Sequence, residues 1–532
     1  MDDRGADLTG GTRTVCDVVR TSLGPFGTSK LVLTEQGEVS TAGSARAILD
    51  GLDVEEPMVT VLADAATEFD DRYRDGTTTL LALAGALLEE AERLSETGVH
   101  PTVVGRGYRD ACEVARASVE DHARPVSSVG TAAVARTILT GTRDPVTRET
   151  VSEYVAEAIE ETDAGEPADG RSHTDGVAVR TRVGPPSETT LVRGVVLDYE
   201  RITDASPDSV TGGVAVLSET VDAPSVAGET ARSDRTASLS VDSFEQRRSI
   251  REYEREAFED RVAAAVDAGC RFVATGMAVN DRVKRRLANG GVAAVQRVDD
   301  ADLRRLALAT GAAVCPSLEA VTPETLGEAD VTTRRLAGRD VYVVESDAGD
   351  PVYTLLCRAP DPRSVDSFER SVEAALASTA RAVREERVVP GGGAVETGAA
   401  ADVREYARSV GRREQLAVEA FADALTVVPR TLAATAGMDG WEAVADLRAA
   451  HAAGRDAVGV DVLAGEPVDV LDGDAPVVDP AGLKRDVLGA ATDLAVRCIR
   501  VDGRLPATEI DPDATDGTGS DQGATAEDAA GE

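Results

Sequence analysis

The sequence predicts a multidomain protein of the α and α/β class, in which two mostly helical regions are separated by an inserted βα region. The chain has 532 residues, enough for about three domains of roughly 100–200 residues each. Hydrophobic residues make up 42% of it, which supports packed cores and excludes a fully disordered chain. The hydrophobic period is helical toward both ends and changes to alternating strands and helices in the middle.

The first region is predicted to be mostly helical. Apolar periodicity favours helices at 15–23, at about 77–94, and from Pro101 onward. Gly98 after one helix and Pro101 at the start of the next are the expected stop and start signals. Between the first two helices, residues 30–34 and 38–41 form a hairpin-like pattern.

The middle region alternates between strand and helix patterns. Strands are predicted at 192–197, 213–217, 272–275, 292–295 and 312–314, and helices at about 280–287 and 299–308. A polar stretch at 223–243 and an amphipathic helix ending at Gly269 interrupt the series. Strands that alternate with helices indicate βα units, so we expect a substantially parallel sheet.

The last region returns to helices, predicted at 365–387, 393–410, 415–428 and 481–501, with a short β-like piece at 458–462 and 468–470. Beyond Arg504 the sequence has many acidic residues and no basic one. We expect this segment to be a disordered acidic tail.

The charge of the chain limits its partners. It carries 95 acidic and 56 basic residues, a formal net charge of −39. We expect no nucleic-acid partner, because phosphate contact needs clustered cations. Lysine occurs only at Lys30, Lys284 and Lys484, and aromatic residues make up only 3% of the chain. This composition favours a halophilic protein from a salt-rich cytoplasm, where dissolved ions screen the repulsion among the excess acidic side chains.

The six cysteines are expected to be buried, reduced structural thiols, because they lie far apart and form no CxxC pair. No apolar run of about 18 residues and no signal-like amino terminus is present, so we expect a cytoplasmic protein without a membrane partner. Trp441, the single tryptophan, is expected to pack in a core.

Three glycine-containing segments are candidate binding loops. Residues 23–27 (Leu-Gly-Pro-Phe-Gly) form either a helix-to-strand turn or a binding loop. Residues 75–79 (Asp-Gly-Thr-Thr-Thr) open a helix, where they are either an ordinary N-cap or a site for phosphate on backbone N–H groups with Mg²⁺ on the carboxylate. Residues 391–393 are a glycine triplet before another helix.

Taken together, in this order and at these distances, the three segments resemble the nucleotide pocket of the group II chaperonins, the archaeal thermosome and eukaryotic cytosolic type. The resemblance continues through residues 98–102, 194–198, 369–371 and 459–462, and it covers the chain from about Thr14 to Asp502.

The resemblance implies an ATP-binding equatorial domain at 1–127 and 382–504, an intermediate domain at 128–195 and 350–381, and an apical substrate-binding domain at 196–349. The tail at 505–532 lies outside this plan, and a lid-like protrusion is expected near 223–262. The implied partners are unfolded protein clients and copies of itself or related chaperonin subunits in a double ring. The implied cofactors are ATP and Mg²⁺. The implied nucleotide-binding residues are Ser22, Leu23, Gly24, Pro25, Asp75, Gly76, Thr77, Thr78, Thr79, Gly392, Gly393 and Asp479, with Asp75 also the metal ligand.

Three positions depart from the family pattern. Ser44 stands where the family usually has an Asp, Ala374 stands where an Asp lies near the attacking water, and Arg74 replaces a glycine before Asp75. Loss of a residue that positions water or accepts its proton lowers the rate by about 10²–10⁴. The sequence therefore predicts a chaperonin subunit that binds ATP but hydrolyses it slowly or not at all, and a regulatory or structural ring subunit is the alternative. Arg74 is expected either to crowd the phosphates, to bind them more tightly, or to lie in solvent.

Overall fold

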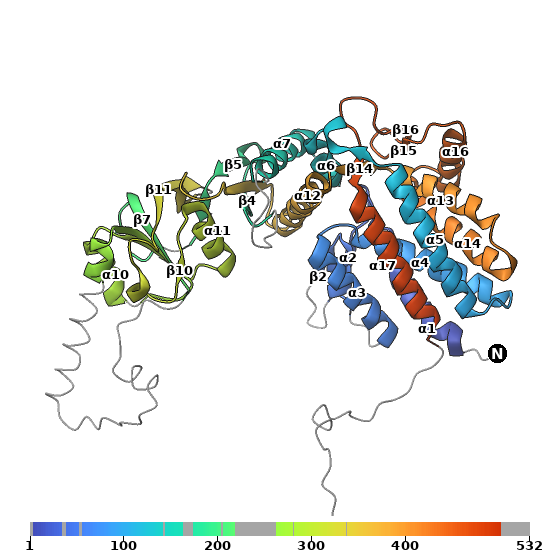
Figure 1. Cartoon of the computed structure of the whole chain (residues 1–532), viewed down its shortest axis with the longest axis horizontal. Coiled ribbons are helices and arrows are strands. Elements are labelled where there is room, and N and C mark those ends of the chain that lie inside the picture. Colours follow the sequence, from blue (N-terminus) through green and yellow to red (C-terminus); the bar gives the residue numbers. More distant parts are fainter. Residues whose placement is uncertain are drawn as a thin grey trace, which may run out of the picture.

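The computed structural model describes residues 4–33, 39–52, 56–141, 144–162, 174–199, 201–203, 206–218, 262–279, 281–336 and 338–501. Three bodies follow one another along an arc (Figure 1). A helical bundle lies at one end, a small body of helices and strands lies in the middle, and a sheet with flanking helices lies at the other end. The first and last described residues both belong to the bundle, so the chain leaves it and returns.

The bundle is built around one apolar helix. This helix, α4 (Thr77–Glu96), packs against α1 (Arg4–Arg20), α5 (Pro101–Asp121), α14 (Arg412–Leu425) and α17 (Ala481–Ile499). Leu80, Leu81, Leu83 and Leu87 of α4 are fully buried, because neighbours cover the helix on several sides. The hydroxyl of Tyr108 donates a 2.8 Å hydrogen bond to the Leu87 carbonyl. The bundle core therefore joins segments from both ends of the sequence.

Smaller elements complete the bundle. They are β1 (Lys30–Leu33) paired antiparallel with β2 (Val39–Ala42), α2 (Ala45–Asp50), α3 (Pro57–Tyr73), α13 (Ala394–Ala407), α15 (Val427–Thr435), α16 (Gly440–Ala452), and β15 (Val458–Asp461) paired antiparallel with β16 (Glu466–Asp469). The pairing of β1 with β2 and of β15 with β16 confirms both predicted β pieces.

Trp441, at the start of α16, is 66% exposed, so its predicted core position is wrong. Its ring lies 4.6 Å from the Arg430 guanidinium carbon. Both residues line a hollow of about 610 Å³ together with Phe26, Arg20 and Lys30. The tryptophan therefore belongs to a surface formed by basic and aromatic side chains. The general tendency of tryptophan to be buried, on which the prediction depended, does not reveal such a surface.

Within the described residues, the middle body has one sheet and three α-helices. Strand β13 (Tyr353–Ala359) pairs parallel with β4 (Val177–Val183) and antiparallel with β5 (Thr190–Arg193). The helices are α6 (Thr131–Ile138), α7 (Pro145–Thr162) and α12 (Val365–Glu385). Helix α12 contacts both this sheet and α17 of the bundle, so it connects the two bodies.

The far body is a seven-stranded sheet. Its strands are β6 (Val195–Leu197), β7 (Ser209–Leu217), β8 (Cys270–Thr275), β9 (Ala293–Gln296), β10 (Val314–Cys315), β11 (Gly327–Leu336) and β12 (Arg339–Glu345), with the helices α10 (Asp281–Asn289) and α11 (Asp300–Thr310). Strands β7 to β10 pair in parallel as predicted. Strands β11 and β12 add antiparallel pairs, which the strand and helix alternation does not predict.

Gly194 divides what the sequence predicts as one strand at 192–197. It adopts φ 135°, and a Cβ there would lie 2.4 Å from the Val344 carbonyl oxygen. Strand β5 before it belongs to the middle body, and β6 after it belongs to the far body. The glycine is needed because the backbone changes sheets at this point.

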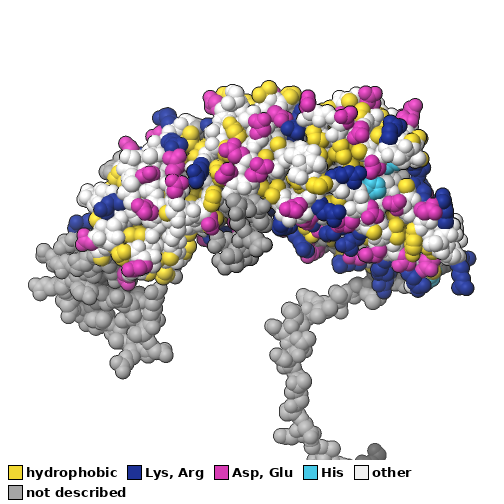
Figure 2. All heavy atoms as spheres, turned by 45° about the horizontal axis from the view of Figure 1, so that its top comes forward, with side chains coloured by type: hydrophobic (Ala, Val, Ile, Leu, Met, Phe, Trp, Pro, Cys, Tyr) yellow, Lys and Arg dark blue, Asp and Glu magenta, His cyan; other side chains and the backbone are white. Residues whose placement is uncertain are grey.

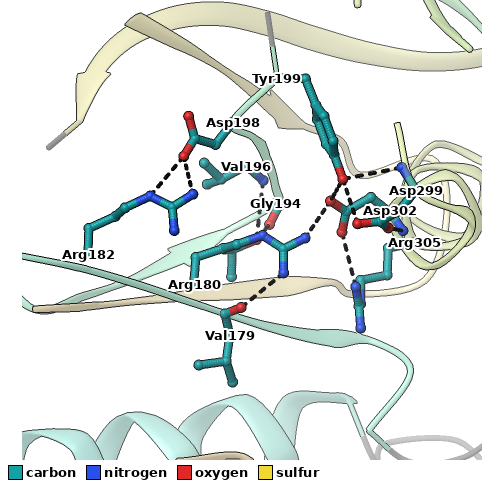
Figure 3. A network of polar contacts seen from close by, with 11 residues as sticks. Val179, Arg180, Arg182, Gly194, Val196, Asp198, Tyr199, Asp299, Asp302 and Arg305 are labelled. Atoms are coloured by element: carbon teal, nitrogen blue, oxygen red, sulfur yellow. Dashed lines mark hydrogen bonds and ion pairs between the residues drawn. The ribbon is translucent and has the colours of Figure 1, made fainter. Parts of the chain in front are cut away.

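A polar network joins the middle and far bodies (Figure 3). Asp302 of α11 is only 1% exposed and accepts hydrogen bonds from Arg180 of β4 and from the Tyr199 hydroxyl, the latter at 2.7 Å. Arg305 donates to its other oxygen at 3.0 Å. The buried charge is thus paired on several sides, as burial of a carboxylate requires.

Acidic and basic side chains are interspersed over the face shown in Figure 2. Many arginines are paired with acids, for example Arg381 with Asp486 at 2.7 Å and Arg404 with Asp423 at 2.7 Å. All six cysteines are free and buried, which confirms the predicted structural thiols. No helix in the described ranges is both long and apolar enough to cross a membrane.

Two predictions fall outside the described residues. The predicted lid-like segment at 223–262 lies outside them except for Val262, and the predicted tail at 505–532 lies outside them entirely. The predicted domain boundaries at 127, 195, 349, 381 and 504 stay a prediction.

Candidate functional site

The loop between α3 and α4 leaves the amino end of α4 open. Arg74 ends α3 in the left-handed conformation with φ 57°, and its N–H donates to the Asp70 carbonyl at 2.7 Å. Gly76 follows at φ 83° as the N-cap of α4, and no side chain caps the helix there. The first N–H groups of α4 therefore form a positively polarised end suited to an anion. The Thr77 hydroxyl is buried and donates a 3.0 Å hydrogen bond to Oδ1 of Asp70.

Asp75 is held from two directions. Its Oδ1 accepts a 2.6 Å hydrogen bond from the Gly76 N–H, and its Oδ2 accepts one of 2.9 Å from the Ser378 hydroxyl of α12. Burial, and then the neighbouring Asp479, raise the pKa of Asp75, and Ser378, Gly76 and Lys484 only partly offset this. A divalent cation would relieve the cost of this carboxylate.

A strand pair brings the glycine triplet beside Asp479. Strand β14 (Arg387–Pro390), which leads into the triplet, pairs antiparallel with β17 (Val478–Pro480), and Val389 lies opposite Asp479. Gly392 and Gly393 have φ of 61° and 78°. A Cβ on Gly392 would lie 2.6 Å from the Val460 carbonyl oxygen, so the close approach of β15 requires glycine at this position.

Lys484 is the site residue that the sequence analysis missed. Its ammonium pairs with Glu396 of α13 at 2.8 Å and with Asp479 at 3.0 Å. Burial acts to lower the pKa of Lys484, but the two carboxylates outweigh it and raise the pKa. The sequence did contain a signal, because Lys484 is one of only three lysines in the chain and lies in the first turn of the last helix, directly after Asp479 and Pro480.

Lys484 connects three predicted pieces of the site. Thr79, Glu396 and Lys484 line one small cavity of about 10 Å³, and the charges of Asp479 and Lys484 both act on Asp75. The Asp75 loop, the helix after the glycine triplet and Asp479 are therefore neighbours. One buried acceptor here, Glu396 Oε2, has no hydrogen-bond partner, and such an atom suits a ligand that brings a donor.

Residues 22–27 form a tight turn after α1. The Ser22 hydroxyl donates to the Val19 carbonyl at 2.7 Å, Leu23 is buried, and Gly24 has φ 79°. A Cβ on Gly24 would lie 2.6 Å from the Leu432 side chain of α15. At Gly24 the turn thus lies against α15, and Pro25 lies near Gly141. The contacts described above join the other site segments to one another and do not include this turn.

The three departures occupy distinct places. Ser44 is the N-cap of α2, and its hydroxyl accepts from the Ala47 N–H at 3.3 Å. Ala374 lies half-buried on α12, one turn before Ser378, so both residues share one face of that helix. Arg74 is exposed and is paired with no carboxylate among the described residues. Its left-handed backbone is one that glycine adopts without strain and that other residues adopt at a cost.

Comparison with known proteins identifies the fold. The model of the TCP-1/cpn60 chaperonin family matches residues 15–508. The chain belongs to this chaperonin family. The chaperonin is 34% identical to a thermosome subunit of Methanopyrus kandleri over 94% of its own length and 91% of the relative. It is 34% identical to a thermosome subunit of Methanocaldococcus jannaschii over 96% and 94%, and 32% identical to thermosome subunit 1 of Haloferax volcanii over 98% and 92%.

These relatives show a group II chaperonin with the predicted multidomain α and α/β architecture. The described residues contain no group of three or more His, Cys, Asp or Glu side chains able to hold a metal alone. A single carboxylate such as Asp75 suits Mg²⁺ that arrives with nucleotide phosphates, because Mg²⁺ in such sites keeps water and phosphate ligands. The donor set of this chaperonin therefore fits a magnesium nucleotide.

Proposed function

We propose that this chaperonin is an ATP-binding subunit that assists protein folding in a double ring, with weak or absent ATP hydrolysis. Asp75 would hold the Mg²⁺, and Gly76 with Thr77, Thr78 and Thr79 would bind phosphate. Gly392, Gly393 and Asp479 would contact the nucleoside, and the turn at Ser22, Leu23, Gly24 and Pro25 would enclose the phosphates. The bound metal would neutralise phosphate charge during transfer.

One observation carries the proposal of weak hydrolysis. The face of α12 that contacts Asp75 through Ser378 carries the methyl group of Ala374 one turn earlier. Ser44, the other departure, caps α2 and offers only a hydroxyl. Neither side chain can accept the proton of an attacking water, so the chain can bind ATP while lacking the groups that orient the water.

The test measures ATP binding and turnover separately on the intact chain in molar salt. We expect MgATP to bind and phosphate release to be at least about 100-fold slower than in a chaperonin that has both carboxylates. The double variant Ser44→Asp with Ala374→Asp should regain turnover. Ordinary turnover in the unmodified chain would contradict slow hydrolysis, and absence of nucleotide binding would contradict the ATP site.

A second function is a regulatory or structural subunit of a mixed ring, favoured by the same missing carboxylates. Neighbouring subunits with complete sites would then supply the turnover. Capture of the chain from its own cytoplasm, followed by native mass measurement at high salt, distinguishes the two. A ring of this chain alone supports the first function, and a second chaperonin chain in the same ring supports the second.

A further inference from the structure

Arg370 is a cation without an acidic partner beside the candidate site. It lies exposed on α12, its Nε donates to the Asp366 carbonyl at 3.2 Å, and its Nη1 lies 3.5 Å from the Ser44 hydroxyl. Within the described residues no carboxylate forms an ion pair with it. Nearby arginines differ: Arg46 pairs with Asp50 at 3.0 Å, and Arg381 pairs with Asp486 at 2.7 Å.

The position of Arg370 on α12 relates it to Asp75. Arg370, Ala374 and Ser378 are spaced by four residues, so they form one stripe along the helix. One end of the stripe contacts Ser44 and the other holds Asp75. The two ends are about 12 Å apart along the helix axis. The phosphates of a nucleotide bound at Asp75 would extend part of the way along this separation. The side chain of Arg370 could extend along the helix from the other end and reach the terminal phosphate.

The residues at 374, on this stripe, and at 44, beside it, determine the charge around Arg370. An aspartate at position 44 would lie within reach of Arg370 and would pair with it, as the hydroxyl of Ser44 cannot. An aspartate at position 374 would repel a terminal phosphate. The stripe and the neighbouring Ser44 therefore present the guanidinium of Arg370 and no carboxylate at positions 44 and 374.

We propose that Arg370 binds the terminal phosphate of ATP and so makes this chain prefer ATP over ADP. The inference rests on the proposed ATP site and adds a specificity residue to it. A guanidinium suits this role, because its N–H groups match phosphate oxygens in paired geometry. An arginine also stabilises phosphoryl-transfer charge, but hydrolysis still requires an oriented water. Arg370 would therefore favour retention of ATP.

The experiment compares the affinities of a non-hydrolysable magnesium ATP analogue and of MgADP by calorimetry, with the full chain at constant high salt. We expect Arg370→Ala to weaken analogue binding about tenfold, the loss of one exposed charge-assisted contact, and to leave ADP binding unchanged. Arg370→Lys should retain part of the preference. The matched control is Arg384→Ala, an exposed arginine in the last turn of the same helix, which should change neither affinity.

Ser44→Asp provides an independent second test. The new carboxylate should pair with Arg370 and reduce analogue binding without removing the arginine. Equal loss of both nucleotides in Arg370→Ala, or no loss of either, would overturn the role of Arg370 while leaving the ATP site intact. If the unmodified chain bound neither nucleotide, the site and this inference would both be wrong.

Discussion

The hydroxyl of Ser378 donates a 2.9 Å hydrogen bond to Oδ2 of Asp75, although the two residues are 303 positions apart in the chain. Ser378 belongs to α12 of the middle body, and Asp75 belongs to the loop that opens α4 of the bundle. Any ligand that changes the charge or position of Asp75 therefore acts directly on the helix that connects the two bodies. This hydrogen bond is therefore part of the candidate nucleotide site and also part of the contact between the middle body and the bundle.

Asp75→Asn is expected to stabilise the nucleotide-free chain and to abolish binding of magnesium nucleotide. Because the folded pKa of Asp75 is raised above the ordinary 3.8, its carboxylate destabilises the folded state, and this cost appears as the pH rises through the folded pKa. The amide removes that cost but cannot bind Mg²⁺ as a carboxylate does. Melting temperature measured against pH, with and without MgATP, checks both parts.

The stabilisation by Asp75→Asn should be present at pH 7 and should disappear below the ordinary aspartate pKa. Equal stabilisation at every pH would mean that the carboxylate charge is not its origin.

Arg74→Gly is expected to stabilise the chain by about 1 kcal/mol, because residue 74 adopts the left-handed region that disfavours side chains. Its φ is 57°. The matched control is Arg72→Gly in the last helical turn of α3, which should destabilise by about 1 kcal/mol. Chemical denaturation of the three proteins gives the comparison. Destabilisation by Arg74→Gly would show instead that the arginine side chain makes a favourable contact.

Lys484→Met is expected to destabilise the chain by about 3–5 kcal/mol, because Glu396 and Asp479 would be left as unpaired, largely buried carboxylates. Adding Glu396→Gln to this variant should recover much of the loss, since one unpaired charge is removed. Denaturation measurements on the two single variants and the double variant form the cycle. Additive effects would contradict the direct pairing of Lys484 with Glu396.

Asp302→Asn is expected to weaken the junction between the middle and far bodies, because the buried carboxylate accepts from Arg180, Tyr199 and Arg305. Loss of the charge should cost about 3 kcal/mol locally. Hydrogen exchange should become faster in α11 and stay unchanged in α4. Asp300→Asn, an exposed neighbour in the same first turn, is the control and should leave both helices unaffected.

Local signals in the sequence predicted much of the bundle. Pro101 begins α5 as expected, and His100 caps it by accepting from the Thr102 N–H at 3.2 Å. Helix α3 was missed although Pro57 at its first turn and the stripe of Met58, Leu62 and Phe69 were visible signals. Such start signals and apolar stripes involve residues close together in the chain, so they can be recognised in the sequence alone.

Features that depend on distant partners could not be predicted in this way. The break at Gly194 is set by the Val344 carbonyl, 150 residues away. The role of Lys484 depends on Glu396 and Asp479 meeting it in space. The motif at 75–79 predicted the exposed helix end, but only the fold places Ser378 against Asp75. Sequence therefore predicts which groups are present, and packing decides which of them meet.

Trp441 gives the molecule a built-in optical signal. It is the single tryptophan of the chain, and it stacks against Arg430 over the hollow that also includes Phe26 of the turn after α1. Intrinsic indole emission consequently arises from one known spot on the surface. A neighbour that covered this spot would shift the emission toward the blue, so burial of this surface can be followed in real time without a dye.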